Sequence, residues 1–127
     1  MIELVENEEK YWEFIRALRN HKSVKRGFIE QNEIEVDSHH KFMEKHGTMY
    51  YICLLDDEPA GFVGVIENDI RVATHPSFQQ KGVGKFMINE LMKKCPQAFA
   101  KVKIENKASL KLFESCGFKK KFYILEK

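Results

Sequence analysis

A chain of 127 residues, with 43% hydrophobic and 31% charged side chains, can bury one core but is too short for two ordinary domains, so we expect a single domain over residues 1–127. The formal net charge of +2 argues against a protein that coats a polyanion. Three cysteines without paired spacing argue against a disulfide framework, and no apolar run approaches the roughly 20 residues that span a bilayer. We therefore expect a cytoplasmic protein without a membrane partner.

The first half of the chain begins with a short strand and two helices. Residues 1–6 alternate as a strand does, and apolar residues recur at helical spacing over residues 8–21. A second helix is predicted to begin at Asp37 or Ser38, either of which is a suitable N-terminal cap, and to end at Gly47.

Three consecutive strands in hairpins are predicted next. They cover residues 48–57, 62–67 and 70–74, and the stretches "EPAG" and "ND" supply turn residues between them. The period then changes, which predicts a helix from Gly84 to Cys95, where a proline follows and ends it.

The remaining segments complete the predicted fold. Residues 98–105 alternate as a strand, Asn106 is a candidate cap for a helix over residues 107–116, and a glycine in left-handed conformation ends that helix. Residues 118–127 predict a final strand. The order β-α-α-β-β-β-α-β-α-β, without repeats or linkers, indicates a mixed α/β (α+β) fold.

The stretch "THPSFQQKGVGKFM" places Gly82 and Gly84 directly before a helix. Glycines let a ligand approach the backbone, and free amides at the positive end of a helix favour a phosphate group, so a pyrophosphate is the expected ligand. Two common phosphate loops do not fit. The P-loop pattern fails at Gln79 and Phe86, and the dinucleotide pattern fails where a methionine replaces a small residue.

Residues 72–84, "VATHPSFQQKGVG", instead resemble the acetyl-CoA loop of the GNAT family of N-acetyltransferases, whose signature is Gln or Arg, two residues, Gly, any residue, then Gly or Ala. Gln79, Gly82 and Gly84 occupy its defined positions. Residues 106–118, "NKASLKLFESCGF", resemble a later block of the same family. The resemblance implies a mixed, mostly antiparallel central sheet with helices on both faces and a splayed pair of strands in the middle of the sheet.

The resemblance also implies acetyl-CoA as acetyl donor. The backbone amides implied for its diphosphate are those of Gln80, Lys81, Gly82, Val83, Gly84 and Lys85. Gln79 would support this loop, while Val72, Ala73 and Thr74 would part from the next strand and pair with the pantetheine arm. The amide near Val72 is the implied oxyanion donor. Asn106 would lie beside the pantetheine, or it simply caps its helix.

The implied catalytic groups are less well defined. Phe113, grouped with the cofactor-binding residues, stands where many relatives carry a tyrosine that protonates the departing thiolate. Tyr123 or Cys116 could replace that hydroxyl, although both also suit plain packing roles. Glu67 and Asp69 are candidate bases that would share one face of a regular hairpin, with Glu67 favoured, whereas charged residues at hairpin ends are commonly just solvated.

The acceptor is suggested by a looser resemblance. The segment "LRNHKSVKRGFI", followed by "HHKF", resembles acetyltransferases that modify nucleotide-linked amino sugars. The basic residues of this segment would meet the nucleotide. We therefore predict transfer of an acetyl group to a primary amine by direct attack. The acceptor is such a sugar, another small amine or a protein amino group, and the alternative is a CoA-binding module with little or no catalysis.

Other ligands are not expected. The histidines at positions 39, 40 and 46 lack the spacing of a zinc site, so no metal is predicted. The lysines at 119–121 are too short a cluster to predict nucleic-acid binding. A monomer and a homodimer remain equally open.

Overall fold

The computed structural model of the protein describes all residues from 1 to 127. Its strands are β1 (Ile2–Glu6), β2 (Tyr50–Leu55), β3 (Glu58–Ile66) and β4 (Asp69–Thr74). Its helices are α1 (Glu9–Asn20), α2 (Lys22–Lys25), α3 (Val36–His46), α4 (Val83–Lys94) and α5 (Lys107–Ser115), with short 3₁₀ turns at Gly47–Met49 and Pro76–Phe78. No helix combines the length and the apolar character needed to cross a membrane.

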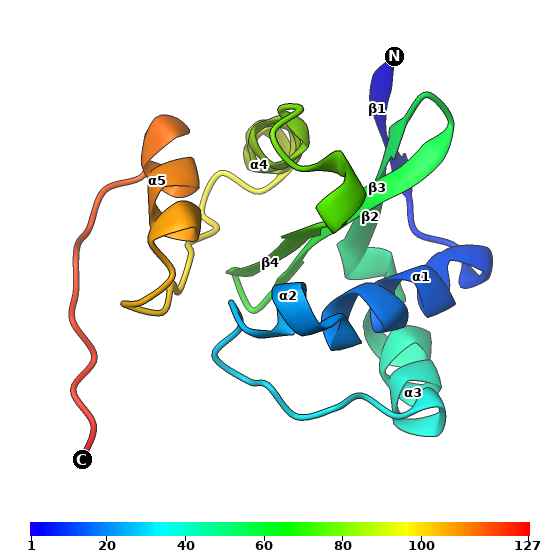
Figure 1. Cartoon of the computed structure of the whole chain (residues 1–127), viewed down its shortest axis with the longest axis horizontal. Coiled ribbons are helices and arrows are strands. Elements are labelled where there is room, and N and C mark those ends of the chain that lie inside the picture. Colours follow the sequence, from blue (N-terminus) through cyan, green and yellow to red (C-terminus); the bar gives the residue numbers. More distant parts are fainter.

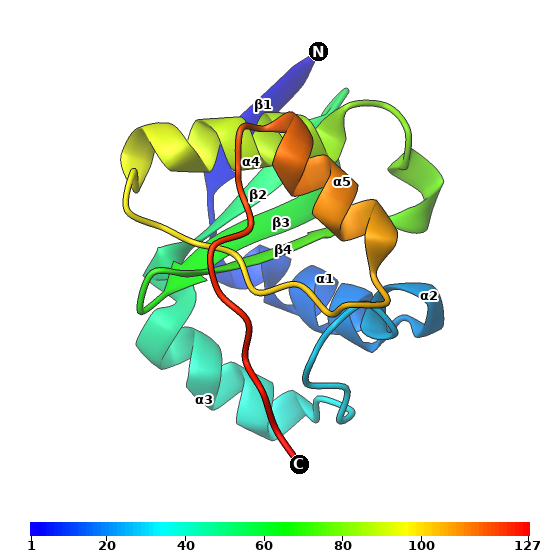
Figure 2. The same ribbon diagram turned by 90° about the vertical axis from the view of Figure 1, so that its left-hand side faces the viewer.

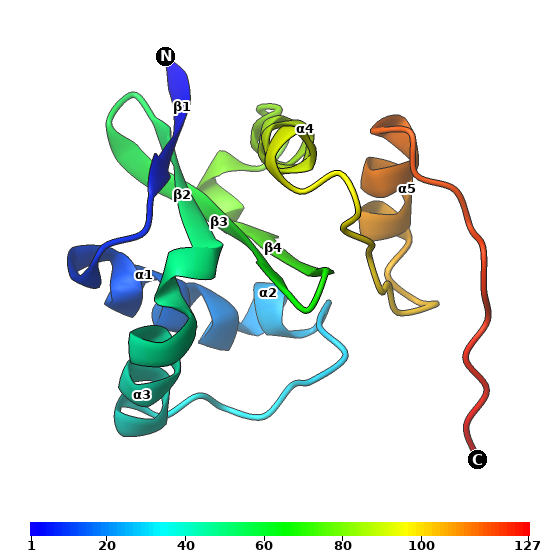
Figure 3. The same ribbon diagram turned by 180° about the vertical axis from the view of Figure 1, so that it is seen from behind.

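The four strands form one antiparallel sheet in the order β1-β2-β3-β4. Helices α4 and α5 cover one face, and α1, α2 and α3 cover the other (Figures 1 and 3). Because side chains alternate across a strand, each face has its own core. One core joins Val63 to Met87 of α4, and the other joins Phe62 to Leu18 of α1. This confirms the predicted mixed fold with helices on both faces.

The second predicted helix, α3, begins earlier than predicted and ends at Gly47 as predicted. Neither Asp37 nor Ser38 caps it, because Glu35 occupies the N-terminal position and makes no side-chain hydrogen bond there. Asp37 lies in the first turn, where a negative charge favours the helix dipole. Gly47 does not adopt the left-handed conformation that glycine often has at the end of a helix. It keeps a right-handed conformation and begins a 3₁₀ turn.

Both hairpin turns are shifted from their predicted positions. The first turn uses Asp56 and Asp57, with φ of 50° and 68°, and the second uses Glu67 and Asn68, with φ of 52° and 66°. Two left-handed residues are what a tight two-residue hairpin requires, and Asp and Asn tolerate that conformation best among residues other than glycine. Asp69 therefore pairs with Ile66 as the first residue of β4, and "EPAG" lies inside β3.

Two predicted strands are wrong. Residues 98–105 form a single parallel bridge, from Phe99 to Asp69, and then leave the sheet. Residues 118–127 form no ladder and run alone beside the body of the molecule (Figures 1 and 2). A strand requires a continuing series of hydrogen bonds to a neighbour, and residues 100–105 make none to β4 after the bridge at Phe99. Helix α5, which lies between these two segments, agrees with prediction, including its Asn106 cap and the left-handed Gly117 after it.

Candidate acetyl-CoA site

The loop before α4 presents a continuous row of free backbone amides. The N–H of Gln79 still donates to Pro76, at 3.5 Å, and the N–H of Phe86 donates to Gly82 at 3.0 Å. Every residue between them, from 80 to 85, donates its backbone N–H to no group of the chain. Free amides at the N-terminal end of a helix are a binding site for phosphate oxygens.

The backbone conformation of this loop turns those amides outward. Gln80 and Gly82 both adopt left-handed conformations, with φ of 63° and 79°. A Cβ at Gly82 would have no atom within 4 Å, so the space beside this residue is open. The side chain of Gln79, predicted to support the loop, is exposed and makes no hydrogen bond within the chain. The loop is instead braced by His75, whose Nδ1 accepts the N–H of Ser77 at 3.0 Å.

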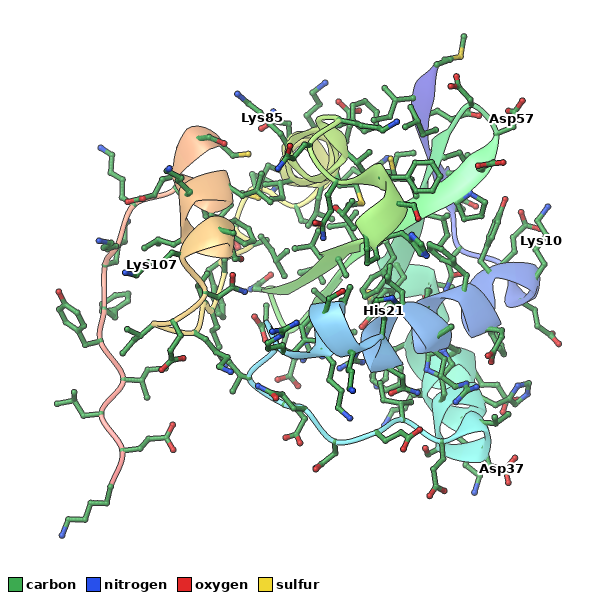
Figure 4. The ribbon with its side chains drawn as sticks, viewed as in Figure 1. Lys10, His21, Asp37, Asp57, Lys85 and Lys107 are labelled. Carbon is green, nitrogen blue, oxygen red and sulfur yellow. The ribbon has the colours of Figure 1, made fainter.

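Gly84 serves packing rather than openness. A Cβ there would approach Leu112 of α5 to 2.9 Å and Thr74 of β4 to 3.6 Å. The missing side chain therefore lets α4, α5 and the end of β4 meet closely. Figure 4 marks Lys85 in the first turn of α4 and Lys107 in the first turn of α5.

The edge of β4 is open where the sequence predicts a splayed strand pair. Ile70 donates its N–H to Phe99 at 2.9 Å, across the bridge to the 98–105 segment. Because neighbouring residues of a strand point their backbone groups to opposite sides, Val72 and Thr74 present theirs to the same edge. No backbone hydrogen bond joins residues 71–74 to residues 100–105. Val72 and Thr74 therefore offer free backbone donors and acceptors in line with the amide row, whereas Ala73 points its backbone toward β3.

Asn106 connects the two halves of the molecule. Its Oδ1 accepts the N–H of Ser109 at 3.1 Å and so caps α5, as predicted. Its Nδ2 donates to the carbonyl of Gly27 at 3.2 Å, and Lys103 donates to the carbonyl of Arg26 at 3.2 Å. Hydrogen bonds therefore connect residues 103–106 to the loop that follows α2.

Two aromatic candidates lie outside the open edge. Phe113 is 4% exposed and packs edge-on against Phe118, with ring centroids 5.1 Å apart, so it belongs to the core under α5. Tyr123 is 89% exposed on the C-terminal segment. Neither position brings a hydroxyl toward Val72 in the structure.

The two candidate bases differ in their surroundings. Glu67 is exposed in the hairpin turn, where the expected sharing of one strand face does not arise. Asp69 lies on β4, its side chain is 19% exposed, and its Oδ2 is 3.4 Å from Nε of Arg71. Asp69 and Arg71 project from the face of β4 that α1 covers, since Ala73, two residues further, packs in the α1 core.

The sequence analysis missed Arg71 and Tyr50. Both lie on the α1 face of the sheet, in a row of cross-strand neighbours that links Tyr50 to Gly64 and Gly64 to Arg71. The only sequence signal for Arg71 is its spacing of two residues from Asp69, which places both side chains on one face of a strand. The prediction put Asp69 in the turn instead of on the strand, so this spacing was not apparent.

The histidines form no metal centre. No group of three or more His, Cys, Asp or Glu side chains is arranged to hold a metal ion. His39 is buried instead, and its Nε2 lies 2.9 Å from the carbonyl oxygen of Trp12. Burial lowers the pKa of His39, although the contact with the Trp12 carbonyl opposes that shift.

Known families and structures agree with this geometry. The model of the acetyltransferase (GNAT) family matches residues 5–118. No curated protein matches the chain. A spermidine N-acetyltransferase from Vibrio cholerae, in complex with CoA and spermine, has a TM-score of 0.84 at 20% identity, over 99% of this chain and 85% of that chain.

Two further solved structures share the fold. AAC(6')-Iy, in complex with the bisubstrate analogue CoA-S-monomethyl-acetylneamine, has a TM-score of 0.74 at 17% identity, over 100% of this chain and 97% of that chain. The yncA protein of Salmonella typhimurium, with its cofactor acetyl-CoA, has a TM-score of 0.76 at 16% identity, over 93% of this chain and 79% of that chain.

The family match over residues 5–118 defines the class of this protein as an acyltransferase that uses acetyl-CoA. The chain belongs to the acetyltransferase (GNAT) family, and its class is that of the acetyl-CoA-dependent N-acetyltransferases.

Proposed function

We propose that the protein transfers the acetyl group of acetyl-CoA to the primary amine of a small molecule. The observation that supports this proposal most is two sets of free backbone groups, the amides of residues 80–85 and the outward-facing groups of Val72 and Thr74. The first set suits a diphosphate and the second suits an amide-bearing arm that adds to a strand edge. Acetyl-CoA contributes the activated thioester.

The chain's own groups then have separate roles. The amides of residues 80–85 bind the diphosphate, and Val72 and Thr74 hold the arm so that the acyl carbon lies beside β4. The N–H of Val72 donates to the acyl oxygen as negative charge develops there, and such a preorganised donor is a large catalytic contribution. The amine nitrogen forms a bond to the acyl carbon, the carbon–sulfur bond breaks, and CoA leaves as a thiolate, while the second proton that the nitrogen loses passes to the thiolate or to water.

The amine must first lose a proton. We assign this role to Asp69 rather than to the favoured candidate Glu67, because Asp69 lies on β4 with its side chain mostly shielded. Its carboxylate would accept the proton directly or through one water. A thiol of ordinary pKa near 8.5 is a good leaving group, so the reaction does not require a hydroxyl at Phe113.

The acceptor within this proposal is a small amine. The relatives' names include a spermidine N-acetyltransferase, which acts on a polyamine. A nucleotide-linked amino sugar is a second case, as is a protein amino group, and both belong in the same assay. The alternative is a CoA-binding module with little catalysis; the observation in its favour is that Phe113 carries no acidic group, although a good leaving group makes such an acid dispensable.

The experiment measures release of free CoA from acetyl-CoA across a panel of amines. Steady release with any amine would exclude the inactive module. We expect Asp69→Asn to lower kcat by about 100-fold, a typical contribution of a general base, and to leave acetyl-CoA binding intact. Glu67→Gln, the matched control, should change kcat by less than about twofold. The assignment of the base is wrong if Glu67→Gln has the larger effect.

A further inference from the structure

Two guanidinium groups, Arg19 on α1 and Arg71 on β4, have few partners within the chain. Arg19 of α1 makes no ion pair and no hydrogen bond, and its Cζ lies 5.5 Å from the ring centroid of Phe28. Burial lowers the pKa of Arg19, the charge of Arg71 lowers it further, and Glu30 and Tyr50 act in the opposite direction. Arg71 has one charged partner, Asp69, whose Oδ2 lies 3.4 Å from its Nε.

A buried hydroxyl without a partner completes this cluster. Tyr50 is 1% exposed, and its hydroxyl oxygen is buried without a hydrogen-bond partner. A Cβ at Gly64 would lie 2.6 Å from Cδ2 of Tyr50, so the ring lies flat across β3 at the one position where no side chain blocks it. Since Gly64 pairs with Arg71, the ring directs its hydroxyl toward Arg71 on β4.

The electrostatics agree with this placement. Burial raises the pKa of Tyr50, whereas the nearby charges of Arg19 and Arg71 and a contact between Arg71 and the hydroxyl lower it. Arg71 is therefore close to the hydroxyl, but the alignment of the two groups does not make a hydrogen bond. Natural proteins rarely leave a buried hydroxyl unsatisfied, because its lost hydration is not replaced. A ligand that accepts a hydrogen bond from Tyr50 would remove this penalty.

We propose that Arg19, Arg71 and Tyr50 bind an oxyanion, a carboxylate or a phosphoryl group, carried by the acceptor amine. The guanidinium fork matches both kinds of oxyanion, and the hydroxyl supplies a further donor. Asp69 beside Arg71 would face the ammonium of the same molecule, so the acceptor is zwitterionic. Two guanidiniums also disfavour a polyamine, which carries positive charges alone.

This inference rests on the proposed function, because it places the oxyanion on the substrate of that reaction. Arg71 immediately precedes Val72, whose N–H faces the open edge. The proposal places the amine of the acceptor at Asp69 on the same strand, with its oxyanion directed toward α1.

The first test compares matched amines by calorimetric titration into the CoA-bound protein. Tyrosine against tyramine reports on a carboxylate, glucosamine 6-phosphate against glucosamine reports on a phosphoryl group, and spermidine serves as the polycation. We expect the oxyanion member of at least one pair to bind about tenfold more tightly, as charge-assisted hydrogen bonds do. Equal binding within both pairs would overturn the inference, as would tightest binding of spermidine.

The second test uses Tyr50→Phe, which removes only the hydroxyl. We expect an unchanged or higher melting temperature without ligand, and about tenfold weaker binding of the preferred oxyanion amine. Arg71→Gln should weaken the same amine at least as much, and its partner without an oxyanion by much less. Lys10 lies at the N-terminal end of α1, whereas His21 follows its C-terminal end (Figure 4). Lys10→Gln removes a charge there and should change neither the melting temperature nor the binding of the amine.

The outcomes separate the two proposals. If acetyl-CoA binds and some amine releases CoA while Tyr50→Phe and Arg71→Gln leave oxyanion preference unchanged, the inference fails and the proposed function stands. If acetyl-CoA neither binds nor is turned over with any amine, both fail. A purely structural role of Tyr50 predicts equal loss for both members of a pair.

Discussion

Gly82 offers the sharpest test of the acetyl-CoA site, because its side chain is absent where the structure shows open space. Its φ of 79° is left-handed, and an added Cβ would meet no atom within 4 Å. In Gly82→Ala the methyl group costs about 1 kcal/mol through backbone strain alone. The same methyl would stand among the free amides and keep a diphosphate from approaching them.

The expected loss of affinity can be worked out from the contacts. Losing one or two charge-assisted hydrogen bonds, at about 1.5–3 kcal/mol each, weakens acetyl-CoA binding by about 100-fold. At about 100 times its dissociation constant, acetyl-CoA stabilises the unchanged protein by about 2.7 kcal/mol. At the same concentration the Gly82→Ala variant should gain only about 0.4 kcal/mol.

Gly117→Ala is the matched control. Gly117 also has a left-handed φ, of 93°, and no atom within 4 Å of an added Cβ, but it lies after α5. Both variants should melt a few degrees lower, about 3–6 °C for a chain of this size. Thermal denaturation with and without acetyl-CoA measures both effects. An equal stabilisation of the two variants by acetyl-CoA would refute the assignment of the loop.

Two further predictions concern groups buried in the two cores. Burial lowers the pKa of His39 below its value in the unfolded chain, so the unfolded state binds a proton first as the pH falls. The free energy of unfolding should therefore decrease from pH 7 to pH 5, and chemical denaturation should show a smaller decrease in His39→Gln than in His40→Gln, which changes an exposed histidine. Burial raises the pKa of Cys53 to about 11, so a thiol reagent should label Cys95 and Cys116 in the folded protein and Cys53 only after unfolding.

The helices and the cofactor loop could be predicted because their signals are local. The apolar spacing of α1 and α4, the Asn106 cap and the glycine at 117 each depend on a few adjacent residues. Gly82 likewise marks the free amides at the start of α4 before any tertiary contact is known. Such features survive in the folded chain because no distant segment competes for the same backbone groups.

The remaining features depend on partners that a sequence does not name. The 98–105 and 118–127 segments alternate like strands, yet a strand forms only along the edge of another strand. The first segment makes a single bridge to β4, and the second makes none. The turn at Glu67 was misplaced by one residue because three successive polar residues suit a turn equally well. That shift moved Glu67 off the strand and concealed the row from Tyr50 to Arg71, which exists only across three strands.

The unpaired edge at Val72 and Thr74 has a consequence for handling the protein. A row of free strand donors and acceptors is a template for another extended chain, and the exposed C-terminal segment from Phe122 to Leu125 supplies apolar side chains of the kind that promote such association. Acetyl-CoA bound along this edge would block strand pairing between molecules, so the bound acetyl-CoA would also reduce aggregation. Light scattering of concentrated samples should rise more slowly when CoA is present.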